Sequence, residues 1–245
     1  MDGLILSFQL FSRIPIKKEV EFSRENLRIA LYCLPLVGLV IGAITGGVMF
    51  FFKFTNAPIA SSLGLLTYFL VSGGLHLDGL SDMTDGFMAN ANKDRTLDIM
   101  KDSLIGSFGT IALILYFLMK FSLYASVDSR IIFTTAITSM VSRASVLLVI
   151  KRGKLARPDG FGAEMKKALN GEYITYIIYF IMGLGLIFIT KNALSVLLVS
   201  LLIGIILEWI SNRKIDGVTG DIYGAIIEIS EIAILLVWRR LVIWI

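Results

Sequence analysis

Acidic side chains gather in residues 73–86, where Asp78, Asp82 and Asp85 stand four and then three residues apart. In a helix this spacing places all three carboxylates on one face. Carboxylates that lie so close repel one another unless a cation balances their charge. Mg²⁺ prefers oxygen ligands and commonly binds one or two carboxylates together with substrate phosphates. We therefore predict a Mg²⁺ site at these aspartates, with an acidic, solvated turn as the alternative.

His76 lies in the same segment and is the only histidine of the chain. A histidine beside carboxylates is a candidate general base, so we predict catalytic roles for His76 and Asp82. The alternative for His76 is a hydrogen-bonded histidine at a membrane interface. A single histidine and a single cysteine, Cys33, give little basis for a zinc site, which further favours Mg²⁺.

Two polar segments farther along the chain carry side chains that suit phosphate groups. In residues 95–103, Asp98 and Asp102 either extend the metal site or pair with neighbouring basic side chains on the surface. The basic run at residues 151–162 ends in a turn that holds Arg157 and Asp159 beside a proline and glycines. Arg binds phosphates through a bidentate fork, although the preference of cytoplasmic loops for positive charge explains most of this run.

The last polar segment, residues 213–221, leads directly into an apolar helix that carries Glu228 and Glu231 on one face. The free N–H groups at the start of that helix form a ready anion site, beside Asp221. Ionisable residues inside a membrane span usually face the interior of the bundle or a watery cavity. Arg143, in an earlier apolar run, is a candidate partner for Glu228.

Long apolar runs must position these polar segments, since 56% of the 245 residues are hydrophobic and only 17% are charged. A run of about 20 residues crosses the hydrocarbon layer as a helix. Because the runs do not alternate in polarity, we predict an all-α, polytopic transmembrane bundle in a single domain, residues 1–245, with a short interfacial helix near the N-terminus. Gly38, Gly42 and Gly46 favour close helix packing in the first span. We expect about seven spans, near residues 28–52, 58–75, 104–126, 130–150, 172–190, 193–211 and 221–241.

The charge pattern predicts how these spans cross the membrane. Most Lys and Arg residues fall in the N-terminal segment and in three polar segments, residues 76–103, 151–171 and 212–221, which would all be cytoplasmic if the N-terminus is inside. This topology explains the net charge of +4, so we do not expect nucleic-acid binding. The three polar segments would then share one face of the membrane and could form one site.

Four motifs resemble the cobalamin synthase family, also called adenosylcobinamide-GDP ribazoletransferase: GGLHLDGLSDMTDG, IMKDSLIGSFG, ARPDGFG and GVTGDIYGAIIEISE. The resemblance runs nearly from end to end. It implies a Mg²⁺-dependent enzyme of the prokaryotic cytoplasmic membrane that joins adenosylcobinamide-GDP to α-ribazole or its 5′-phosphate. The expected products are GMP and adenosylcobalamin or its phosphate. A homo-oligomer is left open.

The resemblance also assigns roles, motif by motif. In the first motif it implies that Asp78, Asp82 and Asp85 hold Mg²⁺ and diphosphate. Asp221 in the fourth motif is the expected further metal ligand. The positions that match the other motifs and are expected to bind substrate are Lys101, Asp102, Ser103, Arg157, Asp159, Thr219 and Glu231. Leu104 departs from the family, which generally has Arg there, so a phosphate contact at that position is in doubt.

Three other classes of membrane protein fit parts of the pattern. CDP-alcohol phosphotransferases also use Asp and Gly at the end of a span, but their Ala-Arg pair is absent after Asp78. Prenyltransferases use two Asp-rich motifs, yet their usual Asn-Asp spacing is missing. An ion-coupled transporter would place acids at several depths of the bilayer, whereas most acids here lie on one predicted face.

Overall fold

The computed structural model describes residues 1–126, 130–171 and 173–242, with side chains as far as residue 239. The regular secondary structure of this part of the chain is helical, apart from one isolated parallel bridge between Leu155 and Val218. The helices are α1 (Asp2–Phe11), α2 (Arg24–Tyr32), α3 (Leu34–Phe52), α4 (Ala57–Ser72), α5 (Leu75–Met88), α6 (Lys93–Ile99), α7 (Ser107–Ala125), α8 (Ile131–Arg152), α9 (Phe161–Leu169), α10 (Ile174–Ile189), α11 (Ala193–Ile215) and α12 (Gly220–Val242). The prediction of an all-α fold is confirmed.

Four helices are long and apolar enough to cross a membrane: α3, α7, α8 and α11. Two bent pairs, α4 with α5 and α9 with α10, meet the same test together, which gives up to six spans among the described residues. The predicted span 172–190 begins at Glu172, which lies outside those residues. Helix α12 is long enough but carries Asp221, Glu228 and Glu231, too many charges for a simple apolar span. The fold fits a multi-pass membrane protein.

The turn between α4 and α5 directs the acidic segment across the end of the bundle. Gly73 and Gly74 have φ angles of 79° and 76°, a left-handed backbone conformation that residues with a Cβ rarely adopt. As a result α5 leaves α4 at 93°. The predicted straight span 58–75 therefore ends at Ser72, because the two glycines break the helix.

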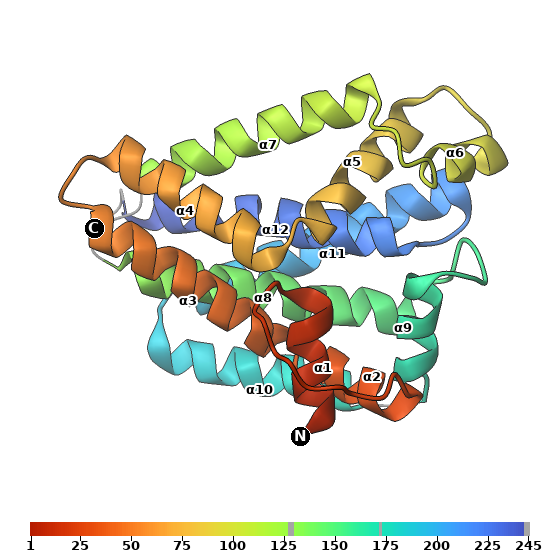
Figure 1. Cartoon of the computed structure of the whole chain (residues 1–245), viewed down its shortest axis with the longest axis horizontal. Coiled ribbons are helices and arrows are strands. Elements are labelled where there is room, and N and C mark those ends of the chain that lie inside the picture. The colour runs from red at the N-terminus through yellow and green to blue at the C-terminus, as the bar shows by residue number, and fades with distance from the viewer. Residues whose placement is uncertain (127–129, 172, 243–245) are drawn as a thin grey trace.

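Close packing of α3 on α8 forms one side of the bundle. A Cβ at Gly38 or Gly42 would collide with backbone atoms of Ser139 or of Thr135 and Ala136 on α8. The predicted role of these glycines in close helix packing is confirmed. Helix α12 runs through the middle of the molecule and contacts α5, α7, α8 and α11 (Figure 1).

The polar connections meet at one end of the bundle, on the right in Figure 1. The segments before and after α6, the loop between α8 and α9, and the turn between α11 and α12 all lie there. Lys93 Nζ on α6 is 3.2 Å from Asp216 Oδ2, and Lys101 Nζ is 3.9 Å from Asp159 Oδ2. Residues far apart in the sequence therefore converge, as the sequence predicted.

Candidate active site

Glycines bring α5 close against the first turn of α12. A Cβ at Gly79 would lie 2.8 Å from the carbonyl oxygen of Asp221, and a Cβ at Gly224 would lie 2.9 Å from the carbonyl oxygen of His76. Only glycine permits such an approach of two backbones. The contact places Asp78 on α5 beside Asp221 on α12, although 142 residues separate them in the sequence.

Replacing Gly79 with alanine is expected to separate α5 from α12 and to destabilise the protein by about 1–3 kcal/mol, because the new methyl group has no space. Thermal unfolding of the purified protein measures this loss. Gly47→Ala is the matched control, since a Cβ there meets nothing within 4 Å. Equal stability of the two variants would contradict the close crossing of α5 and α12.

The loop before α9 is tied to the turn before α12 by backbone hydrogen bonds. The N–H of Val218 donates to the carbonyl oxygen of Lys154 at 2.7 Å, and the N–H of Ala156 donates to that of Val218 at 3.1 Å. This pairing brings Arg157 to Asp221, with 3.6 Å between Nη2 and Oδ2. The third and fourth motifs therefore form one local structure.

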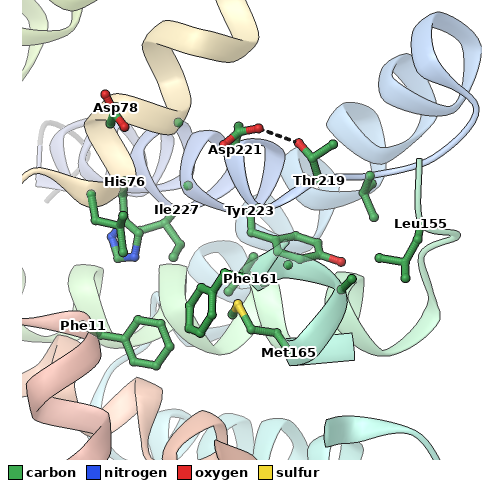
Figure 2. A pocket seen from close by; sticks show the side chains of 18 of the residues that line it. Phe11, His76, Asp78, Leu155, Phe161, Met165, Thr219, Asp221, Tyr223 and Ile227 are labelled. Carbon is green, nitrogen blue, oxygen red and sulfur yellow. Dashed lines mark hydrogen bonds between the residues drawn. The ribbon is translucent and has the colours of Figure 1, made fainter. Parts of the chain in front are cut away.

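A cavity of about 150 Å³, here called the inner cavity, lies between α5, α9 and α12. Its polar side contains Asp78, Arg157, Asp159, Thr219 and Asp221, and the hydroxyl of Thr219 donates to Asp221 Oδ2 at 3.0 Å. Figure 2 shows Thr219 and Asp221 along one side and a group of apolar side chains opposite them. Its apolar lining includes Phe11, Leu34, Leu75, Val146, Phe161, Met165 and Ile227.

A second cavity of about 470 Å³, here called the outer cavity, lies on the other side of Asp78. Its lining includes Asp78, Asp82, Lys101, Asp102 and Ser103. Asp78 thus lines both cavities. The structure brings together most of the predicted site residues around this one aspartate. Lys101 of the outer cavity also pairs with Asp159 of the inner cavity.

Asp85 faces a different neighbour from the other two aspartates of α5. Its two carboxylate oxygens accept hydrogen bonds from the backbone N–H groups of Gly106 and Gly109, at 2.7 and 2.8 Å. These N–H groups lie at the start of α7, where a carboxylate is favoured by the helix dipole. Asp85 therefore anchors α7 to α5, and its role as a metal ligand stays a prediction. It lines a third cavity together with Asp102 and Leu104.

His76 points away from the acidic side chains. It is 8% exposed, and Figure 2 shows its ring on the side of α5 opposite the carboxylate of Asp78. Its Nδ1 is 4.0 Å from Glu228 Oε1, inside the bundle. His76 therefore does not share the acidic face of α5, because residues two apart in an α-helix lie about 200° apart around its axis. Its catalytic role stays a prediction. His76 still lines the apolar side of the inner cavity.

Glu231 lies in a buried charge network and lines neither the inner nor the outer cavity. Its two oxygens accept from Lys120 Nζ at 2.6 Å and from Arg143 Nη1 at 2.7 Å. Glu228 joins the network by accepting from the hydroxyls of Tyr68 and Tyr116. The predicted contact between Glu231 and substrate stays a prediction, and the contacts shown are structural.

Sequence reasoning missed two groups of residues. Lys120 was detectable as a charge inside an apolar run, but its partner required the three-dimensional fold. Phe11, Phe161 and Tyr223 line the inner cavity but were not predicted as site residues, although Phe161 and Tyr223 lie within the third and fourth motifs, which could have marked them. Arg143 pairs with a buried glutamate of α12, as the sequence suggested, but its partner is Glu231 and not Glu228.

The donor set around Asp78 suits a hard metal ion, although it is not a complete cage. Among the described residues no three His, Cys, Asp or Glu side chains are close enough to hold an ion by themselves. Asp78 and Asp82 nevertheless share the outer cavity. Mg²⁺ needs only one or two carboxylates when substrate phosphates and waters complete its shell. The residues therefore fit Mg²⁺ whose remaining ligand positions are filled by phosphate oxygens or waters.

Comparison with known proteins identifies the family of the chain. The family model described as cobalamin-5-phosphate synthase, CobS, matches residues 3–239. The chain is 32% identical to the adenosylcobinamide-GDP ribazoletransferase of Treponema denticola, with 96% of each chain covered. It is 33% identical to the protein of the same name from Clostridium tetani, over 98% of this chain and 96% of the relative. No solved structure matches. The chain belongs to the cobalamin-5-phosphate synthase family.

Proposed function

We propose that the protein joins adenosylcobinamide-GDP to α-ribazole or its 5′-phosphate, releases GMP, and forms adenosylcobalamin or its 5′-phosphate. The names of its relatives support this reaction over a phosphotransferase or prenyltransferase of another family. The observation that carries the proposal is that Asp78 lines two adjoining cavities. A transferase with two substrates needs such a boundary, because the nucleophile and the phosphorus must meet.

The proposed metal site consists of Asp78 and Asp82, with Asp221 as a further ligand from α12. When bound there, Mg²⁺ would neutralise charge on the diphosphate of the substrate. Lys101 and Ser103 in the outer cavity would hold the phosphate oxygens of the GDP-bearing substrate. Arg157 and Thr219 would hold Asp221 in position, as they do in the present structure.

The proposed reaction is a displacement at phosphorus. A ribose hydroxyl oxygen of α-ribazole attacks the phosphorus attached to cobinamide and forms a new P–O bond. The P–O bond to the bridging oxygen of the diphosphate breaks, and GMP leaves with that oxygen. The hydroxyl proton passes to a nearby base, for which Asp82 is our first candidate because it shares the outer cavity with Asp78. His76, on the inner cavity, is the second.

We further propose that the polar end of the bundle faces the cytoplasm of a prokaryotic cell. Helix α12 would be a seventh span, since the charges of Glu228 and Glu231 are balanced by Lys120 and Arg143. Helix α1 would lie at the membrane interface, as a short apolar helix outside the long spans. Protease accessibility of the loop between α8 and α9 in inside-out and right-side-out vesicles tests this orientation.

Purified protein is expected to release GMP from adenosylcobinamide-GDP only when α-ribazole and Mg²⁺ are both present. Chelation by EDTA should stop the release and excess Mg²⁺ should restore it, because the carboxylates alone would repel the diphosphate. Chromatography of nucleotides and corrinoids measures both products. Absence of GMP release under all conditions would refute the proposed reaction, and release that EDTA leaves unchanged would refute the metal dependence.

A further inference from the structure

The apolar side of the inner cavity is not used by the reaction as described so far. Phe11 ends α1 and Phe161 begins α9, and their ring centroids are 6.2 Å apart at an angle of 41°. Met165, one turn farther along α9, and Ile227 on α12 complete this side, and Figure 2 shows these four side chains grouped below Asp221. Three helices from distant parts of the sequence thus supply one apolar, partly aromatic surface.

The volume of the inner cavity suits an aromatic ring. Its volume is about 150 Å³, close to that of an engineered cavity of about 150 Å³ that binds benzene. A flat ring can pack against aromatic side chains in tilted or offset arrangements, which stabilise it beyond simple burial. The ligand must also be polar at one end, because Asp78, Arg157 and Asp221 line the opposite side.

Two donors at the inner cavity point to the polar part of such a ligand. The hydroxyl of Tyr223 is buried, in a residue that is 3% exposed, and it has no hydrogen-bond partner among the described residues. Nη1 of Arg157 is also buried and has no hydrogen-bond partner among the described residues, while Nη2 of that side chain faces Asp221. Buried polar groups normally have partners, so these two indicate a ligand with acceptor atoms.

We propose that the inner cavity binds α-ribazole with its dimethylbenzimidazole base between Phe11, Phe161 and Met165. The sugar then lies toward Arg157 and Tyr223, and its reactive hydroxyl reaches Asp78 at the boundary with the outer cavity. This inference rests on the proposed function and assigns one of its two substrates to a cavity. An acyl chain of a lipid would fill the apolar side but would leave Tyr223 and Arg157 without acceptors.

Shortening an aromatic side chain of the inner cavity should weaken the binding of one substrate and leave the binding of the other unchanged. Phe161→Ala is expected to raise the dissociation constant for α-ribazole roughly tenfold, because stacking and buried area are both lost. The affinity for adenosylcobinamide-GDP should stay within about twofold, since that substrate is assigned to the outer cavity. Calorimetric titration of each substrate into the full-length protein in lipid nanodiscs measures both constants.

A second pair of variants distinguishes a specific loss of binding from a folding defect. Phe11→Ala should weaken α-ribazole binding in the same way, whereas Phe8→Ala, on the same helix and packed against the core outside the inner cavity, should not. Benzimidazole without a sugar should compete with α-ribazole for the wild-type protein. Unchanged α-ribazole affinity in both Phe161→Ala and Phe11→Ala would overturn the proposal, as would an equal loss in Phe8→Ala.

The outcomes also separate this inference from the proposed function. If wild-type protein releases GMP and the Phe161→Ala variant instead loses affinity for adenosylcobinamide-GDP, the reaction stands and the assignment of the inner cavity is wrong. If extraction shows a lipid that wild-type protein retains and Phe161→Ala loses, with α-ribazole affinity unchanged, the cavity is a lipid site. Without GMP release or α-ribazole binding by wild-type protein, the proposed function itself fails.

Discussion

Replacing Asp82 with asparagine is expected to lower the rate of GMP release by at least about a hundredfold, a loss typical of removing a group that stabilises charge in a transition state. The side chain keeps its shape but loses the negative charge that would bind Mg²⁺ and accept the proton. The initial rate of GMP formation at saturating Mg²⁺ and both substrates measures the effect.

The matched control is Asp94→Asn, which removes the same charge from an exposed position in the first turn of α6. This variant is expected to keep nearly wild-type activity, because Asp94 lines neither the inner nor the outer cavity. Similar rates for Asp82→Asn and wild-type protein would remove Asp82 from both of its proposed roles. A loss in Asp94→Asn as large as that in Asp82→Asn would indicate a general effect of charge.

Lys120→Met should destabilise the fold by about 3–5 kcal/mol, the usual effect of breaking a buried ion pair from one side. Lys120 is fully buried, donates to Glu231 at 2.6 Å and lies 3.6 Å from Glu228. Its ammonium also lies 3.2 Å from the centre of the Tyr68 ring. Without Lys120, the two glutamate carboxylates would keep their hydroxyl donors but would lose one of their two buried cations, leaving Arg143, which contacts Glu231.

Thermal unfolding in detergent, followed by circular dichroism, measures this loss. Lys191→Met is the control, since Lys191 is exposed in the turn before α11. The double variant Lys120→Met with Glu228→Gln should recover part of the stability, because it removes the carboxylate left without its cation. An unfolding temperature equal to that of wild-type protein in Lys120→Met would show that the network does not hold α7 against α12.

The helices were largely predictable because membrane spans require long apolar runs. The bends were not. Gly73 and Gly74 permit a left-handed turn, but the 93° angle between α4 and α5 depends on how α5 packs on α12. The sequence predicted a span at residues 221–241, but not the central position of α12, which depends on the pairing of Glu231 with Lys120 on α7 and with Arg143 on α8.

Within the site, helical spacing correctly grouped Asp78 and Asp82, which share the outer cavity. The same spacing placed Asp85 on their face, yet its carboxylate meets the start of α7, a neighbour that periodicity cannot identify. Asp221 was found through its motif and reaches Asp78 only because Gly79 lets the helices touch. The apolar wall of the inner cavity was not predicted, because an apolar side chain such as Phe11 does not stand out in a membrane bundle and Phe161, although it lies in the third motif, has no polar group that suggests a role.

The central claim is that Asp78 holds a metal-bound diphosphate where the two cavities meet. Electron paramagnetic resonance of Mn²⁺, used in place of Mg²⁺, tests it directly in the full-length protein without α-ribazole. We predict that adenosylcobinamide-GDP promotes Mn²⁺ binding to wild-type protein and that Asp78→Asn abolishes this substrate-dependent binding. Equal substrate-dependent Mn²⁺ binding by Asp78→Asn and wild-type protein would contradict the account.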